Sequence, residues 1–276
     1  MTHSRQRIRD LLAAAGVEPR RSLGQNFVAD PNTVRRVVRL AEVADGDAVV
    51  EVGPGVGSLT LALREAGADV LAIEIDPTLA AIVREVVDDG VTVLVADALT
   101  VDWPEVLAGR AQWKLIANLP YNVGTTIVLD VLEQAPMVDS LLIMVQHEVA
   151  QRLVAGPGSK TYGIPSVKVA WWADAAIVGS VPPTVFVPKP RVESSLVRLV
   201  RHDRQPDDVT SAEVAALVDT AFGQRRKMLR RSLGEHVGDH VFEAAGIDPT
   251  LRPEMVGVDG WIDLARAAGR DDVSVP

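Results

Sequence analysis

The sequence predicts an α/β protein whose central sheet is mostly parallel and doubly wound. Between residues 49 and 154, apolar β-branched segments alternate with amphipathic segments in five successive units, and the connections are short. The first apolar segment ends in three alternate glycines, Gly53, Gly55 and Gly57, and polar residues follow the ends of the next three. Ligands of such sheets bind at the carboxyl ends of the strands. The sequence therefore predicts a ligand site along one edge of the sheet.

Hydrophobic periodicity and capping residues give the position of each element. Strands are expected at 49–52, 70–75, 92–95, 114–117, 141–146, 176–181 and 194–200. Helices are expected at 4–15, from 31, where Asp30 and Pro31 form a cap and first-turn proline, and at 59–66, 78–87, 125–134, 147–154, 211–222, 225–233, 237–245 and 258–268. The apolar segment 166–173 fits either a helix or a strand.

The pattern changes after residue 156, and beyond residue 201 it predicts helices alone. The last four expected helices are separated by glycine and proline, which is typical of a small all-helical domain. We therefore expect two domains. The first spans residues 1–203 and begins with an arm at 1–29, and the second spans residues 204–276.

The composition excludes several classes of protein and site. The 276 residues include no cysteine, so a disulfide framework, a thiolate metal site and a cysteine nucleophile are all impossible. No apolar run approaches the length of a membrane span, and the first ten residues lack the apolar core of a signal peptide. We therefore expect a soluble, cytoplasmic protein with no membrane partner.

The glycine turn after the first strand is typical of a nucleotide-type ligand. Glycine lacks a Cβ, so ligand and backbone can approach closely at such a turn. The turn lacks the Gly-Lys-Ser or Gly-Lys-Thr ending of a triphosphate-binding loop, and its G-x-G-x-G spacing differs from the G-x-G-x-x-G of dinucleotide-binding proteins. A small adenosine ligand fits this spacing better than a pyrophosphate. The alternative is a βα turn that binds nothing.

Two carboxylates follow the glycine turn at strand ends. Glu74 lies 21 residues after Gly53, the spacing at which nucleotide-binding folds place an acid on the ribose hydroxyls. Asp97 follows the next strand, where its carboxylate could accept a hydrogen bond from an adenine amino group. A solvated strand end is the alternative for Glu74, and the glycine turn makes it the weaker one.

The tetrapeptide Asn118-Leu119-Pro120-Tyr121 after the fourth strand fits methylation of an exocyclic amine on a base. The lone pair of that nitrogen is delocalised into the ring, and acceptors that hold both amine hydrogens free it. The Asn118 side-chain oxygen and a neighbouring backbone carbonyl can serve as these acceptors, with Pro120 fixing the turn. Tyr121 can stack on a base that has left its helix. Taken alone, the tetrapeptide would more simply be a turn after a strand.

Eight motifs in order carry a resemblance to a known family. They are L-G-Q-N-F (23–27), E-V-G-P-G-V-G (51–57), E-I-D (74–76), D-A (97–98), N-L-P-Y (118–121), L-V-A-G-P-G-S-K-x-Y-G (153–163), F-V-P-K-P-R-V-E-S (186–194) and F-G-Q-R-R-K-M-L-R-R-S-L (222–233). Together they resemble the ribosomal RNA adenine dimethyltransferases, above all those of the bacterial small subunit. The resemblance spans roughly residues 20–233.

The resemblance implies a Rossmann-like methyltransferase fold with a seven-stranded sheet, and S-adenosylmethionine as methyl donor, with S-adenosylhomocysteine as product. The implied acceptor is 16S rRNA in the immature 30S subunit, where two adjacent adenines of the 3′-terminal hairpin are each methylated twice at N6. The implied first domain is catalytic and the second recognises RNA. A monomer without a metal is expected.

The resemblance also assigns roles to individual residues. The implied donor-binding residues are Asn26, Val28, Gly53, Gly55, Glu74, Asp97 and Asn118. The implied catalytic residues are Asn118, Leu119, Pro120, Tyr121 and Phe186, the last being a second aromatic wall opposite Tyr121. Val28 stands where the family more often has Leu, and Lys189 interrupts a proline run; we expect both departures to be tolerated.

A basic run is the candidate RNA contact. The protein has a net charge of −9, yet Arg225, Arg226, Lys227, Arg230 and Arg231 fall within seven positions. On a helix, Arg226 and Arg230 would lie on one face, as would Lys227 and Arg231. Such a cluster on an acidic protein favours phosphate contact over the alternative of a solvated helix face.

Three other functions remain open. A large-subunit (23S) rRNA adenine methyltransferase of the macrolide-resistance type would carry the same catalytic residues. A ribosome-assembly protein that binds RNA without catalysis would not need intact Glu74, Asp97 and Asn118. A nicotinamide oxidoreductase is disfavoured by the glycine spacing and leaves the N-L-P-Y tetrapeptide unexplained.

Overall fold

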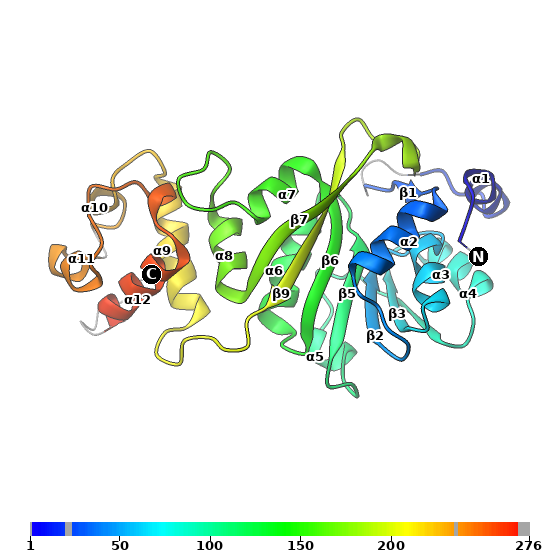
Figure 1. Cartoon of the computed structure of the whole chain (residues 1–276), viewed down its shortest axis with the longest axis horizontal. Coiled ribbons are helices and arrows are strands. Elements are labelled where there is room, and N and C mark those ends of the chain that lie inside the picture. The colour runs from blue at the N-terminus through cyan, green and yellow to red at the C-terminus, as the bar shows by residue number, and fades with distance from the viewer. Residues whose placement is uncertain (1, 20–23, 235–236, 270–276) are drawn as a thin grey trace. The chain divides into compact units, whose positions relative to one another are not determined.

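The computed structural model describes residues 2–19, 24–234 and 237–269 (Figure 1). The chain forms two compact units, Met1–Ala150 with Ala175–Arg201, and Gln151–Asp174 with His202–Pro276. The last of the three chain positions at which the units divide, between Arg201 and His202, lies close to the boundary expected after residue 203. The segment Gln151–Asp174 was expected in the first domain but packs with the second unit, because its helix buries Val167 and Trp171 in that unit's core.

The first unit is built on a seven-stranded, mostly parallel sheet, as expected, with strand order β4-β3-β2-β5-β6-β9-β7. The parallel strands are β2 (Ala48–Val52), β3 (Asp69–Glu74), β4 (Val91–Val95), β5 (Trp113–Asn118) and β6 (Val138–Gln146). The remaining strands are β9 (Ser194–Arg201), antiparallel to β6, and the edge strand β7 (Ala173–Val181). The strand order reverses between β2 and β5, and such a switch point is where ligands bind in open α/β sheets.

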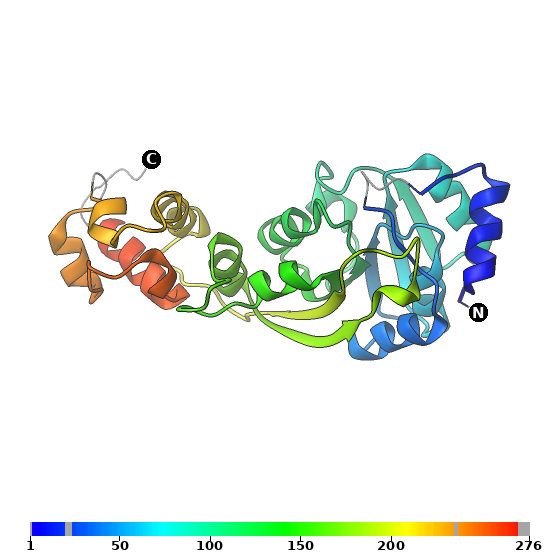
Figure 2. The same ribbon diagram turned by 90° about the horizontal axis from the view of Figure 1, so that it is seen from above.

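Helices lie on both sides of this sheet, so it is doubly wound (Figure 2). In chain order they are α1 (Arg5–Ala14), α2 (Pro31–Leu40), α3 (Ser58–Glu65), α4 (Pro77–Val86), α5 (Trp103–Val106), α6 (Gly124–Gln134) and α7 (His147–Leu153). Asp30 and Asp76 cap α2 and α4 through their side chains, each followed by a first-turn proline. Aliphatic side chains of α2 and α3 pack on the sheet around Val49, Ile116 and Leu142.

A short pair of strands lies outside the main sheet and was not foreseen. β1 (Phe27–Val28) pairs antiparallel with β8 (Phe186–Val187), which follows the 3-10 helix Pro183–Val185. Phe27 lies opposite Val187, and Val28 lies opposite Phe186. This pairing joins the N-terminal arm to the segment ahead of β9, two regions about 160 residues apart in the sequence.

Among its described residues, the regular elements of the second unit are helices, apart from the first two residues of β7. It contains α8 (Ile164–Trp172), α9 (Ser211–Gly223), α10 (Leu229–Ser232), α11 (Asp239–Ala245), the 3-10 helix Pro253–Met255 and α12 (Val258–Gly269). Of the ambiguous segment 166–173, all but the last residue thus belongs to helix α8, and Ala173 begins β7. Trp261, Phe242 and Leu217 are fully or almost fully buried in its core.

The helix expected at 225–233 is wrong for its first half. Only Leu229–Ser232 is helical, because α9 ends at Gly223 and the chain then turns. Arg225 stabilises the turn: its Nε donates to Glu254 Oε2 at 2.9 Å and its NH2 group donates to the Lys160 carbonyl at 3.1 Å. Contacts with residues distant in sequence override the local helical pattern here.

Candidate functional site

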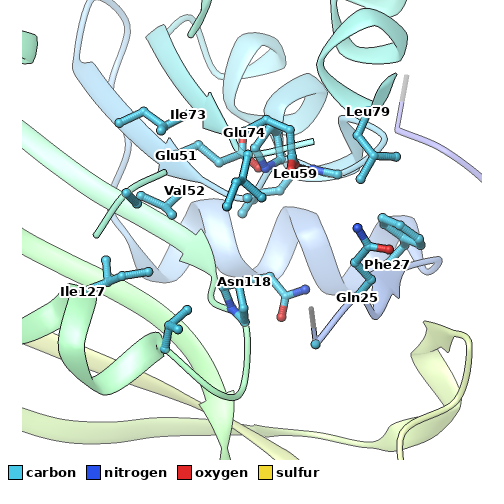
Figure 3. Close-up of a pocket in the computed structure, with 18 of the residues that line it drawn as sticks. Gln25, Phe27, Glu51, Val52, Leu59, Ile73, Glu74, Leu79, Asn118 and Ile127 are labelled. Carbon is cyan, nitrogen blue, oxygen red and sulfur yellow. Dashed lines mark hydrogen bonds between the residues drawn. The ribbon is translucent and has the colours of Figure 1, made fainter. Parts of the chain in front are cut away.

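A cavity of about 280 Å³ lies at the carboxyl ends of the strands, at the switch point of the first unit (Figure 3). The arm ahead of α2, the glycine turn and the N-L-P-Y turn contribute to its lining. All seven residues expected to bind a donor line it, together with Pro120: Asn26, Val28, Gly53, Gly55, Glu74, Asp97 and Asn118. Leu119, Tyr121 and Phe186 do not line it.

The glycine turn needs its glycines. Gly53, Gly55 and Gly57 have φ angles of 71°, 60° and 85°, in the left-handed region that disfavours other residues. A Cβ on Gly55 would lie 2.7 Å from the ring of Phe27, and one on Gly53 would lie 3.9 Å from Pro120. The turn therefore lies directly against the arm and close to the N-L-P-Y turn.

The N-terminal arm covers the outer side of the glycine turn. Ile8 and Leu12 of α1 pack with Phe27 and Val56. The His3 Nε2 atom lies 3.0 Å from the Val56 carbonyl oxygen. Burial lowers the pKa of His3 below its usual value, so the ring is neutral at pH 7, and Nε2 carries the hydrogen because a carbonyl can only accept.

Arg5 joins the same arm to the segment ahead of β9. Its guanidinium donates to the Phe186 carbonyl at 3.0 Å and also to the Thr184 carbonyl. With the β1–β8 pairing, this contact fixes the arm to the first unit by two independent sets of hydrogen bonds.

Glu74 closes one wall of the cavity. Its side chain is 4% exposed, Oε2 accepts from the Gly55 amide and Oε1 accepts from the Asp76 amide, both at 3.0 Å. Burial raises the pKa of Glu74, although the two amide hydrogen bonds act in the opposite direction. Each oxygen keeps a second lone pair that can accept from a ligand hydroxyl.

Glu51 is a cavity residue that the sequence reasoning missed. It is 1% exposed, it lines the cavity near Glu74, and its Oε2 has no hydrogen-bond partner among the described residues (Figure 3). Burial raises its pKa to about 8; the Thr60 hydroxyl lowers the pKa and the Glu74 charge raises it further. The signal was an acid inside the otherwise apolar strand V-V-E-V.

Asp97 lies two residues beyond the end of β4 and lines the cavity. Its Oδ1 accepts from the Leu99 amide at 3.0 Å. Ile75 and Leu99 also line the cavity, and they are 50% and 38% exposed. Apolar walls beside a carboxylate suit a flat heterocycle with an amino group.

The orientation of the Asn118 amide follows from a single contact. Its Nδ2 donates to the carbonyl oxygen of Asn26 at 2.9 Å. Only the nitrogen can make this bond, so Oδ1 is the acceptor atom of the amide, and none of the described residues donates to it. The cavity separates Asn118 from Glu51 and Glu74 (Figure 3).

The backbone beyond Asn118 offers a second acceptor. The Pro120 carbonyl accepts from the amides of Val123 and Gly124 at 3.3 and 3.0 Å. The Leu119 carbonyl accepts no hydrogen bond from any residue that the structure describes, whereas the Leu119 side chain is buried. Asn118 Oδ1 and the Leu119 carbonyl are therefore two acceptors that the described residues leave available at this turn.

The two aromatic residues expected to contact the target base differ in how deeply they are buried. Tyr121 is half-buried, and its hydroxyl lies 3.0 Å from Ser194 Oγ. Phe186 is 0% exposed and packs in the core with Val28 and Leu196. Phe186 therefore does not line the cavity in this structure, because the β1–β8 pairing places its ring in the interior, and its role as a wall opposite Tyr121 stays a prediction.

The basic run is mostly exposed but is not one helix. Arg226, Lys227, Arg230 and Arg231 are exposed and form no ion pair with the described residues, whereas Arg225 is held by Glu254. Arg226 and Lys227 lie outside helix α10, so they do not share a helix face with Arg230 and Arg231, and that expectation is wrong. Across residues 2–19, 24–234 and 237–269, no group of three or more His, Asp or Glu side chains could hold a metal, and no helix could span a membrane.

Two solved structures share this fold. The crystal structure of a dimethyladenosine transferase from Plasmodium falciparum has a TM-score of 0.73 and 19% identity, covering 90% of this chain and 98% of that one. The crystal structure of 23S rRNA methyltransferase ErmE has a TM-score of 0.69 and 23% identity, covering 88% and 99%. These similarities establish the fold.

Curated relatives are much closer in sequence. Ribosomal RNA small subunit methyltransferase A of Kineococcus radiotolerans is 48% identical, covering 95% of this chain and 89% of the relative. The protein of the same name from Streptomyces griseus subsp. griseus is 48% identical, covering 94% and 92%. Residues 16–266 match the family described as Ribosomal RNA adenine dimethylase. The chain therefore belongs to the ribosomal RNA adenine dimethylase family.

Proposed function

We propose that this protein transfers methyl groups from S-adenosylmethionine to the N6 amines of two adjacent adenines in the 3′-terminal hairpin of small-subunit rRNA, two to each adenine. Its relatives at 45–48% identity are named as small-subunit enzymes. The observation that carries the chemistry is the Asn118 amide, whose Oδ1 is left free at the same cavity as the glycine turn.

The cavity residues fit S-adenosylmethionine. When bound, this donor supplies a methyl group on a positively charged sulfur. Glu74 has acceptor capacity for the ribose hydroxyls, and Asp97 lies between apolar walls suited to the adenine. Gly53, Asn26 and the Val28 backbone are left to contact the methionine part, where the absence of a Cβ at Gly53 keeps the space open.

Asn118 then holds the acceptor nitrogen. We infer that Oδ1 and the Leu119 carbonyl accept the two N6 hydrogens of the target adenine, which localises the nitrogen lone pair toward the methyl group. Tyr121 stacks on the extruded base. The proton leaves after the transfer, so no strong base is required beside the amine.

Glu74→Ala is expected to weaken donor binding before it affects any later step. The substitution removes the ribose acceptors and leaves the Gly55 amide without its partner, so we expect the Kd for S-adenosylhomocysteine to rise about 10- to 100-fold. Isothermal titration calorimetry measures this. Asn122→Ala, on an exposed side chain at the same cavity, is the control and should change the Kd less than about twofold. Equal affinity in Glu74→Ala and wild type would remove Glu74 from the donor site.

The exposed part of the basic run is proposed to contact RNA phosphates. Arg226→Glu combined with Arg230→Glu is expected to weaken RNA binding and to reduce the slope of log K against log salt by about two, one for each lost contact. Filter binding of a small-subunit hairpin at several salt concentrations measures the slope. Arg39→Glu with Arg204→Glu makes the same charge change at exposed positions elsewhere. An equal effect of both pairs would assign the loss to net charge alone.

The experiment that tests the proposed function is methylation mapping. The protein is incubated with labelled S-adenosylmethionine and either immature 30S subunits or 50S subunits, and the modified nucleotides are then mapped. We expect label on two adjacent 16S adenines. Label on 23S rRNA would favour the resistance-type enzyme, and binding to 30S subunits without any label would favour a non-catalytic assembly protein. A monomer, the immature 30S subunit as substrate and a cytoplasmic location remain part of the proposal.

A further inference from the structure

The Tyr121 hydroxyl has a fixed partner on a different strand. It lies 3.0 Å from Ser194 Oγ, and either group can donate. Ser194 is 0% exposed and is the first residue of β9, where it pairs with Gln146 of β6. The backbone of Ser194 is therefore fixed by strand pairing in the buried sheet, whereas Tyr121 is half-buried and lies in a turn.

The backbone of Tyr121 is also held. Leu119 before it is buried, and the carbonyl of Pro120 accepts two amide hydrogen bonds. A tyrosine side chain has two rotatable bonds between its backbone and its ring. With the backbone fixed at one end and the hydroxyl bound at the other, both rotations are restricted and the ring keeps one orientation.

We propose that Ser194 is a positioning residue that sets the orientation of the Tyr121 ring on the acceptor side of the N-L-P-Y turn. The proposal rests on the proposed function, in which that ring stacks on the target adenine. Neither residue lines the donor cavity. Ser194 therefore acts on the acceptor base through Tyr121 and leaves donor binding untouched.

The neighbouring serine provides a matched control. Ser195 is 1% exposed, also lies on β9, and pairs with Val145 of β6. Successive strand residues point to opposite faces, and the Ser195 hydroxyl bonds His147 Nδ1 at 2.9 Å instead of Tyr121. Ser194→Ala and Ser195→Ala thus remove the same atom from equally buried, adjacent positions, and only one of them touches the tyrosine.

The kinetic test compares these variants on immature 30S subunits. Ser194→Ala is expected to lower kcat about five- to tenfold, the equivalent of one hydrogen bond, with Kd values for S-adenosylhomocysteine and RNA within about twofold of wild type. Tyr121→Phe keeps the ring and removes the hydroxyl, so it should show the same loss, and the double variant should lose no more. Ser195→Ala should keep wild-type kcat. Full activity of Tyr121→Phe, or equal losses in both serine variants, would overturn the proposal.

A spectroscopic test needs no RNA. The chain has two tyrosines, so uniform 3-fluorotyrosine labelling gives two ¹⁹F signals, and Tyr121→Phe identifies which one belongs to Tyr121. Ser194→Ala should shift or sharpen this signal as the ring gains freedom, and Ser195→Ala should not. An unchanged signal in Ser194→Ala contradicts the positioning role. A wild-type protein that methylates no small-subunit adenine contradicts the proposed function instead, so the two failures are distinguishable.

Discussion

Asn118→Ala is expected to lower kcat by at least about 100-fold while S-adenosylhomocysteine still binds. The substitution removes Oδ1, the acceptor left free when Nδ2 donates to the Asn26 carbonyl. Loss of one preorganised polar group aimed at a reacting centre typically costs 10²- to 10³-fold in rate. Donor affinity should fall less than about fivefold, because Glu74, Asp97 and the glycine turn remain in place. Single-turnover methylation of 30S subunits and calorimetry of donor binding measure the two effects separately.

Asn122→Ala is the matched control for this prediction. Asn122 also lines the cavity and lies four residues along the same turn, but its side chain is exposed. Its replacement should leave both the rate and the donor affinity close to wild type. If Asn118→Ala lost donor binding as strongly as it lost rate, the amide would serve the donor instead of the acceptor amine.

The parallel core of the fold could be predicted because its signals are local. Each strand from β2 to β6 contains an apolar run, and a glycine or polar residue stands at its end or within two residues after it. The prolines at 31 and 77 mark helix starts. The features that were missed depend on distant partners. The β1–β8 pairing has two residues in each strand, which is too short for a periodic pattern, and the turn at Arg225 is held by Glu254 and Lys160.

The residues that line the cavity could be predicted for the same reason, but the position of Phe186 could not. Gly53, Glu74, Asp97 and Asn118 lie at strand ends or within two residues after them, so a parallel sheet necessarily brings them to one edge. The position of Phe186 depends instead on the strand that pairs with it, which a motif does not reveal. Motifs therefore locate the residues attached to regular elements better than those on long-range connections.

Burial of Glu51 makes the stability of the folded protein depend on pH, which the motif E-V-G-P-G-V-G did not reveal. Its carboxyl is 1% exposed, Oε2 has no hydrogen-bond partner among the described residues, and burial raises its pKa to about 8. An unfolded glutamate has its ordinary pKa of 4.5. Between these two values the folded protein keeps a proton that the unfolded chain releases. The stability linked to Glu51 is therefore fully present below pH 4.5 and is lost as the pH rises toward 8.

Glu51→Gln is expected to remove this dependence, because an amide does not titrate. One pKa unit corresponds to about 1.4 kcal/mol. The free energy of unfolding of the variant minus that of wild type should therefore rise by about 3 to 4 kcal/mol from pH 5 to pH 8. Urea denaturation at pH 5, 6, 7 and 8 measures the difference, and a constant cost of burying the amide cancels from the comparison. Glu85→Gln, at an exposed position, should show no such trend. A difference between Glu51→Gln and wild type that stayed constant with pH would mean that Glu51 is already ionised in the folded protein and is held by a partner.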